Sequence, residues 1–243
     1  MFDKPFTKEN LDAYLKDLAK EFRKRNGNKM PAEIVLIGGA AILAGYSFRD
    51  MTFDVDALVY ASSAMKEAIG RVADLRNLPH DWLNTDFRRT ASYSDKLIGI
   101  SQYYRTYSSI LTIRIVTAEY LIAMKLMSGR QYKGDLSDII GILLEHEKRE
   151  EPIAREAINK AVTVLYGEDA HIPEPALAVL NNAYSTGDLE ALYRTIRDNE
   201  VKSKEVLLEF EEQYPGQLRG ENINEILETA KRKREAARKA APL

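Results

Sequence analysis

The chain has 243 residues, of which 35 are Lys or Arg and 37 are Asp or Glu, so its formal net charge is −2. Hydrophobic residues make up 45% and charged residues 30%, a composition that excludes a disordered chain. The balanced charge gives no reason to expect non-specific binding to nucleic acid. The lack of cysteine excludes disulfides and cysteine-ligated zinc.

No run of apolar residues reaches the roughly 20 that a membrane-spanning helix needs; the longest uncharged run is Ile34 to Phe48. The first ten residues carry charges where a signal peptide would have an apolar core. We therefore expect a cytoplasmic protein that does not contact a membrane.

The first half of the chain alternates between helix and strand patterns. Apolar residues from Leu11 to Phe22 recur at helical spacing, which predicts a helix over 7–26. Ala32 to Ile37 is rich in β-branched residues and predicts a buried strand that ends in a Gly-Gly turn into a helix. Phe53 to Tyr60 alternates, which predicts a second strand.

The patterns that follow predict mostly helices. In chain order they are a helix from Ser62 or Ser63 to about Leu75, a short helix over 80–89, strands over Leu97–Ser101 and Ile110–Val116 joined by a tyrosine-rich connection, a helix from Thr117 to near Gly129, and helices over about 135–148, 152–166, 174–184, 188–213 and 222–240. We expect an α+β fold, with a small mixed sheet flanked by helices over 1–130 and a helical bundle over 131–243 packed against it.

The segment from Gly38 to Asp56 carries the residues that indicate chemistry. Glycines at a strand end let backbone N–H groups approach a phosphate, and the following helix N-terminus adds partial positive charge. Asp54 and Asp56 lie two residues apart on a strand, so their carboxylates point the same way. Hard cations such as Mg²⁺ prefer such oxygen ligands, with substrate phosphates filling the other positions.

Each feature alone has an ordinary structural explanation. A Gly-Gly pair is common in tight turns, and two acids on a strand are often just solvated. A dinucleotide-binding site is a competing interpretation, but it requires G-x-G-x-x-G, whereas the glycines here are at 38, 39 and 45. The order and spacing of glycines and acids favour nucleoside triphosphate binding.

The pattern GG followed by R-x-x-T-x-D-x-D resembles the DNA polymerase β-like nucleotidyltransferase superfamily. More narrowly, it is similar to small bacterial nucleotidyltransferases that include type IV abortive-infection toxins. A later segment matches as well, with Lys125, Arg130, Asp135 and Asp138 in corresponding positions. The resemblance covers about residues 33–145, and it implies a nucleotidyltransferase-like fold for the first unit.

The resemblance also implies roles for single residues. Asp54 and Asp56 would ligate Mg²⁺, and Lys125 would contact phosphate or the attacking group. Asp138, rather than Asp135, would be a further acid or base. The glycines and two loop residues would bind the nucleotide: Gly38, Gly39, Arg49 and Thr52. From its own helix pattern, Lys125 fits equally well on a solvated helix face.

One departure concerns a third carboxylate, which the superfamily usually carries on a later strand. The matching strand, Ile110 to Val116, has Thr112 and Arg114 instead. The site then uses one metal, borrows Asp138, or is degenerate. Arg114 fits either a phosphate contact or an outward-facing strand charge.

The resemblance implies a Mg²⁺-dependent enzyme that transfers a nucleoside monophosphate from an NTP to an acceptor hydroxyl. The acceptor, whether tRNA, protein or small molecule, is not specified by the sequence, and neither is the oligomeric state. A toxin role would imply an antitoxin protein as partner. The alternative is a decayed member of the fold that binds a nucleotide or a partner.

Two other clusters have ordinary explanations beside functional ones. Basic residues from Lys231 to Lys239 fit nucleic-acid binding or a solvated helix end. The preceding acidic region, which includes Glu200, would offset their positive charge. The tyrosines at 103, 104 and 107 fit either base stacking or packing.

Overall fold

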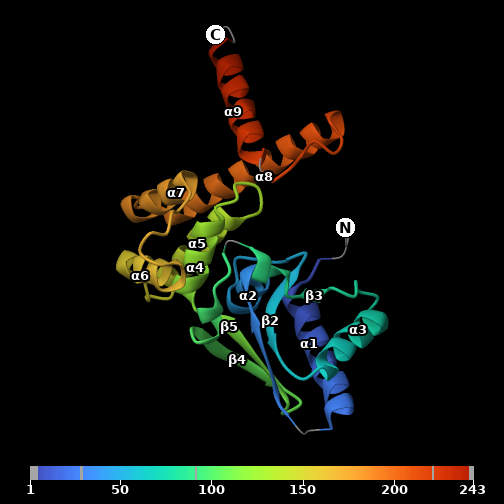
Figure 1. Ribbon diagram of the computed structural model, residues 1–243. Helices are drawn as coiled ribbons and strands as arrows, with labels where there is room; N and C mark the ends of the chain where they lie inside the picture. Colours follow the sequence, from blue (N-terminus) through green and yellow to red (C-terminus); the bar gives the residue numbers. More distant parts are fainter. Residues whose placement is uncertain (1–4, 28–29, 91, 221, 241–243) are drawn as a thin grey trace.

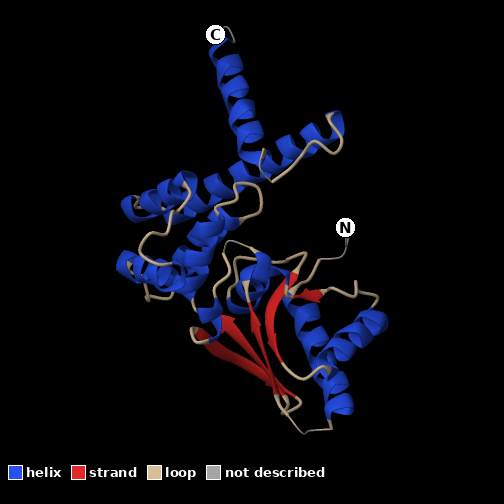
Figure 2. Cartoon of the chain, in the orientation of Figure 1, coloured by secondary structure: helices blue, strands red, loops and turns tan. Residues whose placement is uncertain are grey.

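The computed structural model describes residues 5–27, 30–90, 92–220 and 222–240. Within these ranges the chain forms an α+β fold with one mixed sheet, as the sequence predicts (Figure 1). The strands lie in the lower half of Figure 2, and the second half of the chain is helical. None of the described helices is long and apolar enough to span a membrane.

The sheet is built around β1 (Ala32–Leu36). It pairs antiparallel with β2 (Val55–Tyr60) on one side and parallel with β5 (Leu111–Val116) on the other. The two-residue β3 (Leu83–Asn84) extends the sheet beyond β2, and β4 (Ser101–Tyr107) extends it beyond β5. The strand order is therefore β3-β2-β1-β5-β4.

Side chains of the central strands alternate between two faces of the sheet. One face is buried along the three central strands, through Ile34, Leu36, Ala57 and Ile113 among others. The register places Glu33 beside Tyr60 and Thr112 on the opposite face. Asp56 points to this same face because it lies two and four residues from Leu58 and Tyr60 on one strand. This face, on which Val35 and Leu58 are also fully buried, therefore carries one of the two expected metal ligands.

Helices of the first half cover the sheet. The helix α1 (Lys8–Asn26) begins at a capping box made by Thr7 and Asn10, and it packs against α3 (Ala64–Arg76). The short α2 (Gly38–Gly45) follows β1 directly and contacts β2 and β5.

The second half consists of helices that pack around α4 and α5. They are α4 (Ala118–Ser128), α5 (Asp135–Lys148), α6 (Arg155–Tyr166), α7 (Glu174–Ser185), α8 (Leu189–Gln213) and α9 (Ile223–Ala240). The helix α4 packs against α5 and α6, and α5 packs against α7 and α8. One cluster of buried residues runs from the sheet into these helices, whereas α9 projects away from the body (Figure 1). A domain boundary near residue 130 stays a prediction.

Two sequence-based expectations about local structure were wrong. The predicted strand over Leu97–Ser101 is instead the end of a 3-10 helix, Asp95–Ile98, followed by a turn, and the tyrosine-rich segment is itself strand β4, Ser101–Tyr107. The predicted short helix over 80–89 contains β3 followed by a 3-10 turn, Asp86–Arg89. The side chain of Asn84 accepts the N–H of Asp86, which starts this turn directly after the strand.

Candidate functional site

The start of α2 and the start of β2 lie against each other. Gly38 has φ +54°, a conformation that side chains rarely adopt, and a Cβ on it would lie 3.8 Å from Oδ2 of Asp56. A Cβ on Gly39 would lie only 2.6 Å from Oγ1 of Thr52 and 3.3 Å from Nη2 of Arg49. The glycines therefore allow the helix N-terminus, the Arg49 loop and the acidic strand to meet.

Thr52 is a structural link in this loop. It is 2% exposed, and its hydroxyl donates to the carbonyl oxygen (3.2 Å) and the carboxylate (3.1 Å) of Asp54. Its backbone forms an isolated antiparallel bridge with Phe6, through N–H···O contacts of 2.7 and 2.9 Å. Thr52 thus positions Asp54, and the chain segment before α1 positions Thr52.

Asp54, which directly precedes β2, and Asp56 on β2 are close enough to affect each other. Burial raises the pKa of Asp56 to about 6, and the charge of Asp54 adds to the increase. A hydrogen bond from Asn84 and the positive charges of Arg130 and Lys125 act in the opposite direction. Asn84 lies beside Asp56 in the register of β2 and β3, and sequence analysis missed it because β3 is only two residues long.

A group of alternating charges lies beside these acids. The Lys125 amine is 2.8 Å from both Oδ1 of Asp135 and Oδ2 of Asp138. Arg49 binds both oxygens of Asp138 at 2.7 and 2.5 Å, and Nε of Arg130 is 2.7 Å from Asp135. The group has three cations and two carboxylates, which leaves one net positive charge beside the Asp54–Asp56 pair.

Burial and pairing fix the charge states in this group. Burial opposes the charged form of Lys125, but Asp138 and Asp135 outweigh it, so the pKa of Lys125 lies above its ordinary value. Burial also opposes ionisation of Asp135, yet Lys125 and Arg130 hold its pKa well below the ordinary range. Lys125 is 7% exposed, so its placement on a solvated helix face was wrong.

The family model described as "Nucleotidyltransferase of unknown function (DUF6036)" matches residues 13–168, more than half of the chain. The chain belongs to this family. No curated protein and no solved structure matches it.

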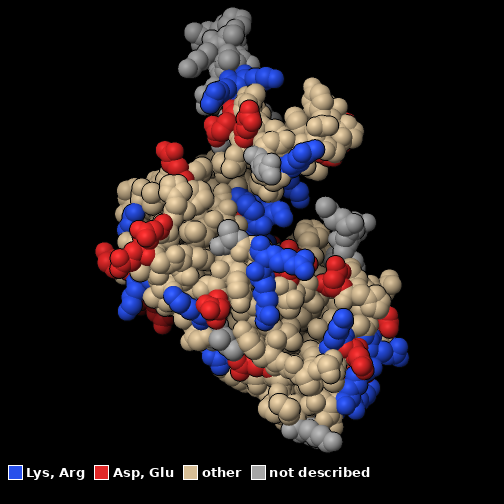
Figure 3. All heavy atoms as spheres, in the orientation of Figure 1, with Lys and Arg blue, Asp and Glu red and all other residues tan. Residues whose placement is uncertain are grey.

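In this nucleotidyltransferase the structure brings most of the predicted site residues together. Gly38, Gly39, Thr52 and the Asp54–Asp56 pair at the start of β2 are adjacent, and Arg49 connects them to Asp138 and Lys125. Lys133 and Arg130 come from the turn before α5, where the side chain of Arg130 is 42% exposed. On the face shown in Figure 3, Lys and Arg side chains gather over the middle of the molecule.

Arg114 lies elsewhere. Its guanidinium donates to the hydroxyl and carbonyl oxygens of Ser101 on β4 and lies 3.7 Å from Glu33 on β1. It connects three strands of the sheet, so its side chain is engaged away from the glycine turn. Continuing the register of β1 and β5 places Val116, not an acid, level with Asp56.

The carboxylates of Asp54 and Asp56 are the two groups of this site that fit a divalent cation. Mg²⁺ is commonly held by one or two carboxylates with substrate phosphates and water completing the shell, and two crowded carboxylates meet that need. Among the described residues no group of three or more His, Cys, Asp or Glu is arranged to hold a metal. Of the tyrosines that the sequence singled out, Tyr107 has a structural contact, because its hydroxyl donates to Asp12.

Proposed function

We propose that this nucleotidyltransferase uses Mg²⁺ and an NTP to transfer a nucleoside monophosphate to an acceptor hydroxyl. The observation that carries the proposal is the contact between the Gly38-Gly39 helix start and the Asp54–Asp56 strand, with cations on its flank. Membership of the family supports nucleotidyl transfer in general, and this contact supports the choice of residues.

Each part of the contact has a task in the proposed reaction. Backbone N–H groups at the start of α2 bind triphosphate oxygens, since helix N-termini favour anions. Asp54 and Asp56 hold the metal, which when bound neutralises charge on the phosphates. Thr52 fixes the orientation of Asp54, and Asn84 fixes that of Asp56.

The charged group supplies positive potential and rigidity. Arg49 lies beside Gly39 and Arg130 is partly exposed near Asp54, so both suit phosphate oxygens. Lys125 is enclosed by two carboxylates, so we assign it to holding Asp135 and Asp138 in place rather than to direct phosphate contact. The acceptor hydroxyl gives its proton to water as its oxygen forms a bond to the α-phosphorus; the bond between that phosphorus and the α–β bridging oxygen breaks, and pyrophosphate leaves with the electron pair.

The first test is nucleotide binding. We expect calorimetry to detect MgATP or MgGTP binding in the wild type and at least about tenfold weaker binding in Asp54→Asn/Asp56→Asn. Asp50→Asn is the matched control, because Asp50 is an exposed acid in the same loop. Equal binding by the double variant would refute the site assignment.

The second test is transfer. Four α-labelled NTPs, incubated with total RNA, protein extract and small hydroxyl-bearing compounds, should label one class of acceptor in a Mg²⁺-dependent way. tRNA as acceptor and an antitoxin as partner would support the resemblance to abortive-infection toxins. Growth arrest on expression, relieved by a neighbouring gene product, would test the toxin role.

A decayed regulatory module is the second candidate. It is favoured by the absence of a three-acid cluster in the described residues and by Val116 at the β5 position level with Asp56. Under this alternative the wild type binds nucleotide or a partner but labels no acceptor. Mg²⁺-dependent labelling that Asp54→Asn/Asp56→Asn abolishes would exclude it.

A further inference from the structure

The helix α5 begins without a cap of its own. The first N–H groups of a helix have no partner within it, and Gly134 at the N-cap position has no side chain to supply one. Instead, Oε1 of Glu200 accepts the N–H of Leu136 at 2.9 Å and that of Ser137 at 3.4 Å. The cap therefore comes from α8, more than sixty residues along the chain.

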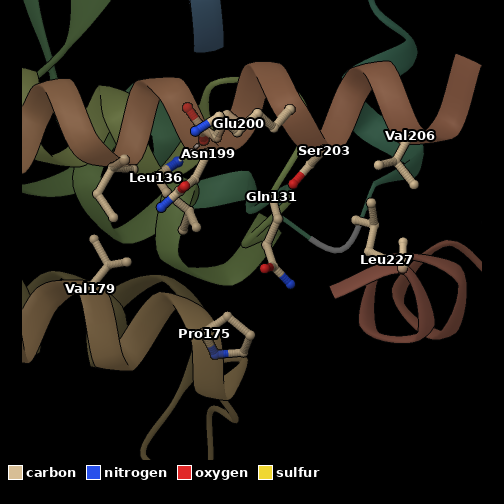
Figure 4. A pocket seen from close by; sticks show the side chains of 12 residues that line it. Gln131, Leu136, Pro175, Val179, Asn199, Glu200, Ser203, Val206 and Leu227 are labelled. Carbon is tan, nitrogen blue, oxygen red and sulfur yellow. Dashed lines mark hydrogen bonds between the residues drawn. The ribbon is translucent and has the colours of Figure 1, made fainter. Parts of the chain in front are cut away.

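Glu200 is buried where it makes this contact. It is 6% exposed, and its second oxygen, Oε2, has no hydrogen-bond partner in the described part of the chain. A cavity of about 380 Å³ adjoins it, lined from four helices by Leu136, Val179, Ser203 and Leu227 among others (Figure 4). A carboxylate is costly to bury, so its retention here requires a compensating contact, and the α5 N–H groups supply one.

The capped turn is the one that organises the charged group. Leu136 and Ser137 lie between Asp135 and Asp138 in the sequence. These two acids hold Lys125, Arg130 and Arg49, and Arg49 lies beside Gly39. A displacement of this turn would therefore move the cations that flank the proposed nucleotide site.

We propose that Glu200 is a positioning residue, which caps α5 from α8 and so holds Asp135, Asp138 and their cations in place for nucleotide binding. The proposal rests on the function proposed above. It assigns a task to α8, which lies outside the residues that the family model matches.

Three substitutions at Glu200 separate the effect of side-chain length from that of charge. Glu200→Gln keeps an oxygen acceptor at the same distance, Glu200→Asp keeps the charge but shortens the side chain, and Glu200→Ala removes both. Ser203→Ala is the matched control, because Ser203 is also buried on α8 beside the cavity but has no hydrogen bond to α5 within the described ranges.

The test that needs no nucleotide is NMR on the intact protein. Amide exchange at Leu136 and Ser137 should accelerate at least about tenfold in Glu200→Asp and Glu200→Ala, and the Nε–H signals of Arg49 and Arg130 should shift. Glu200→Gln and Ser203→Ala should resemble the wild type. If Glu200→Ala does not fold, the comparison of Glu200→Asp with Glu200→Gln still tests the proposal. Unchanged exchange or unchanged arginine signals in Glu200→Asp would overturn the proposal.

Calorimetry with MgATP and MgGTP completes the test. We expect at least about tenfold weaker binding in Glu200→Asp and less than about threefold in Glu200→Gln. If the wild type binds nucleotide and a folded Glu200→Asp variant binds it equally tightly, the positioning role would be overturned. No binding by the wild type would instead refute the proposed function, and the arginine signals would then show separately whether Glu200 positions the charged group.

Discussion

Gly39 is a position where one methyl group should have a measurable effect. Its added Cβ would lie 2.6 Å from Oγ1 of Thr52, closer than packed atoms approach. We expect Gly39→Ala to lower the free energy of unfolding by about 1–3 kcal/mol and to abolish nucleotide binding. Urea denaturation and calorimetry measure the two effects.

A double variant identifies the cause. In Gly39→Ala/Thr52→Ala the hydroxyl is gone, so the two substitutions should cost less together than their separate effects add up to. Gly187→Ala is the control, since a Cβ there has no neighbour within 4 Å among the described residues. Strictly additive effects would contradict the predicted collision.

Glu200 should make stability depend on pH. Burial raises its pKa from 4.5 to about 7, with hydrogen bonds from Ser137 and Leu136 opposing the increase and Asp138 adding to it. A raised carboxyl pKa stabilises the folded state fully below pH 4.5, and this contribution is lost as pH rises through about 7. The side chain of Glu200→Gln does not titrate, so this variant keeps its stability while the wild type loses it. The free energy of unfolding of Glu200→Gln relative to wild type should therefore rise by about 2–3 kcal/mol between pH 4.5 and 8. Urea midpoints across this range measure it, and a constant difference would refute it.

At the scale of elements, α4 and α5 are held together by charge inside the protein. Lys125→Met leaves Asp135 and Asp138 buried without their shared amine. Because Arg130 and Arg49 still pair with them, we expect a loss of about 3 kcal/mol, at the lower end of the range for broken buried pairs. Lys133→Met, at an exposed position in the preceding turn, should change stability by less than about 0.5 kcal/mol. Equal effects of the two substitutions in urea denaturation would contradict the structural role of Lys125.

Elements with a strong local pattern could be predicted from the sequence. The helix α1 has its capping residues and its apolar face within 20 residues, and β1 with the glycine turn into α2 is equally local. Strand β4 could not be predicted, because Tyr103 and Arg105 look like connection residues until pairing with β5 is known. Tyr107 of this strand is buried, and its hydroxyl donates to Asp12 on α1, a contact that no local pattern indicates.

The candidate site divides in the same way. Gly39, Asp54 and Asp56 lie within one continuous segment, so spacing alone suggested their proximity. The enclosure of Lys125 depends on how α4 and α5 pack, and nothing in its helix pattern specifies that. Glu200 lies in a helix with several other glutamates, so its sequence does not distinguish it from a solvated acid.

At the scale of the whole molecule, the helices beyond the family match complete the fold of the matched part. The helix α5 packs against α7 and α8, and Ala176, Leu180 and Leu192 belong to the common core. We expect a chain ending at residue 168 to show no cooperative thermal transition by circular dichroism, because α5 then keeps α4 but loses α7, α8 and its cap.

Removal of α9 alone is the control. Leu227 is the buried residue among the α9 side chains that the structure describes, so a chain ending at residue 220 should still unfold cooperatively, with a Tm lower by no more than about 10 °C. A cooperative transition in the 168-residue chain at the wild-type temperature would show that α7 and α8 are dispensable for the fold.

The bridge between Phe6 and Thr52 has a mechanical consequence. The ring of Phe6 is 1% exposed and stacks near Trp82, so the segment before α1 is anchored by both its backbone and its side chain. A load applied at the N-terminus, for example through a surface tether in a force experiment, would reach Thr52 and then Asp54 before it reached the body of the sheet. Pulling from this end should therefore disable the acidic strand at forces that leave the helices intact.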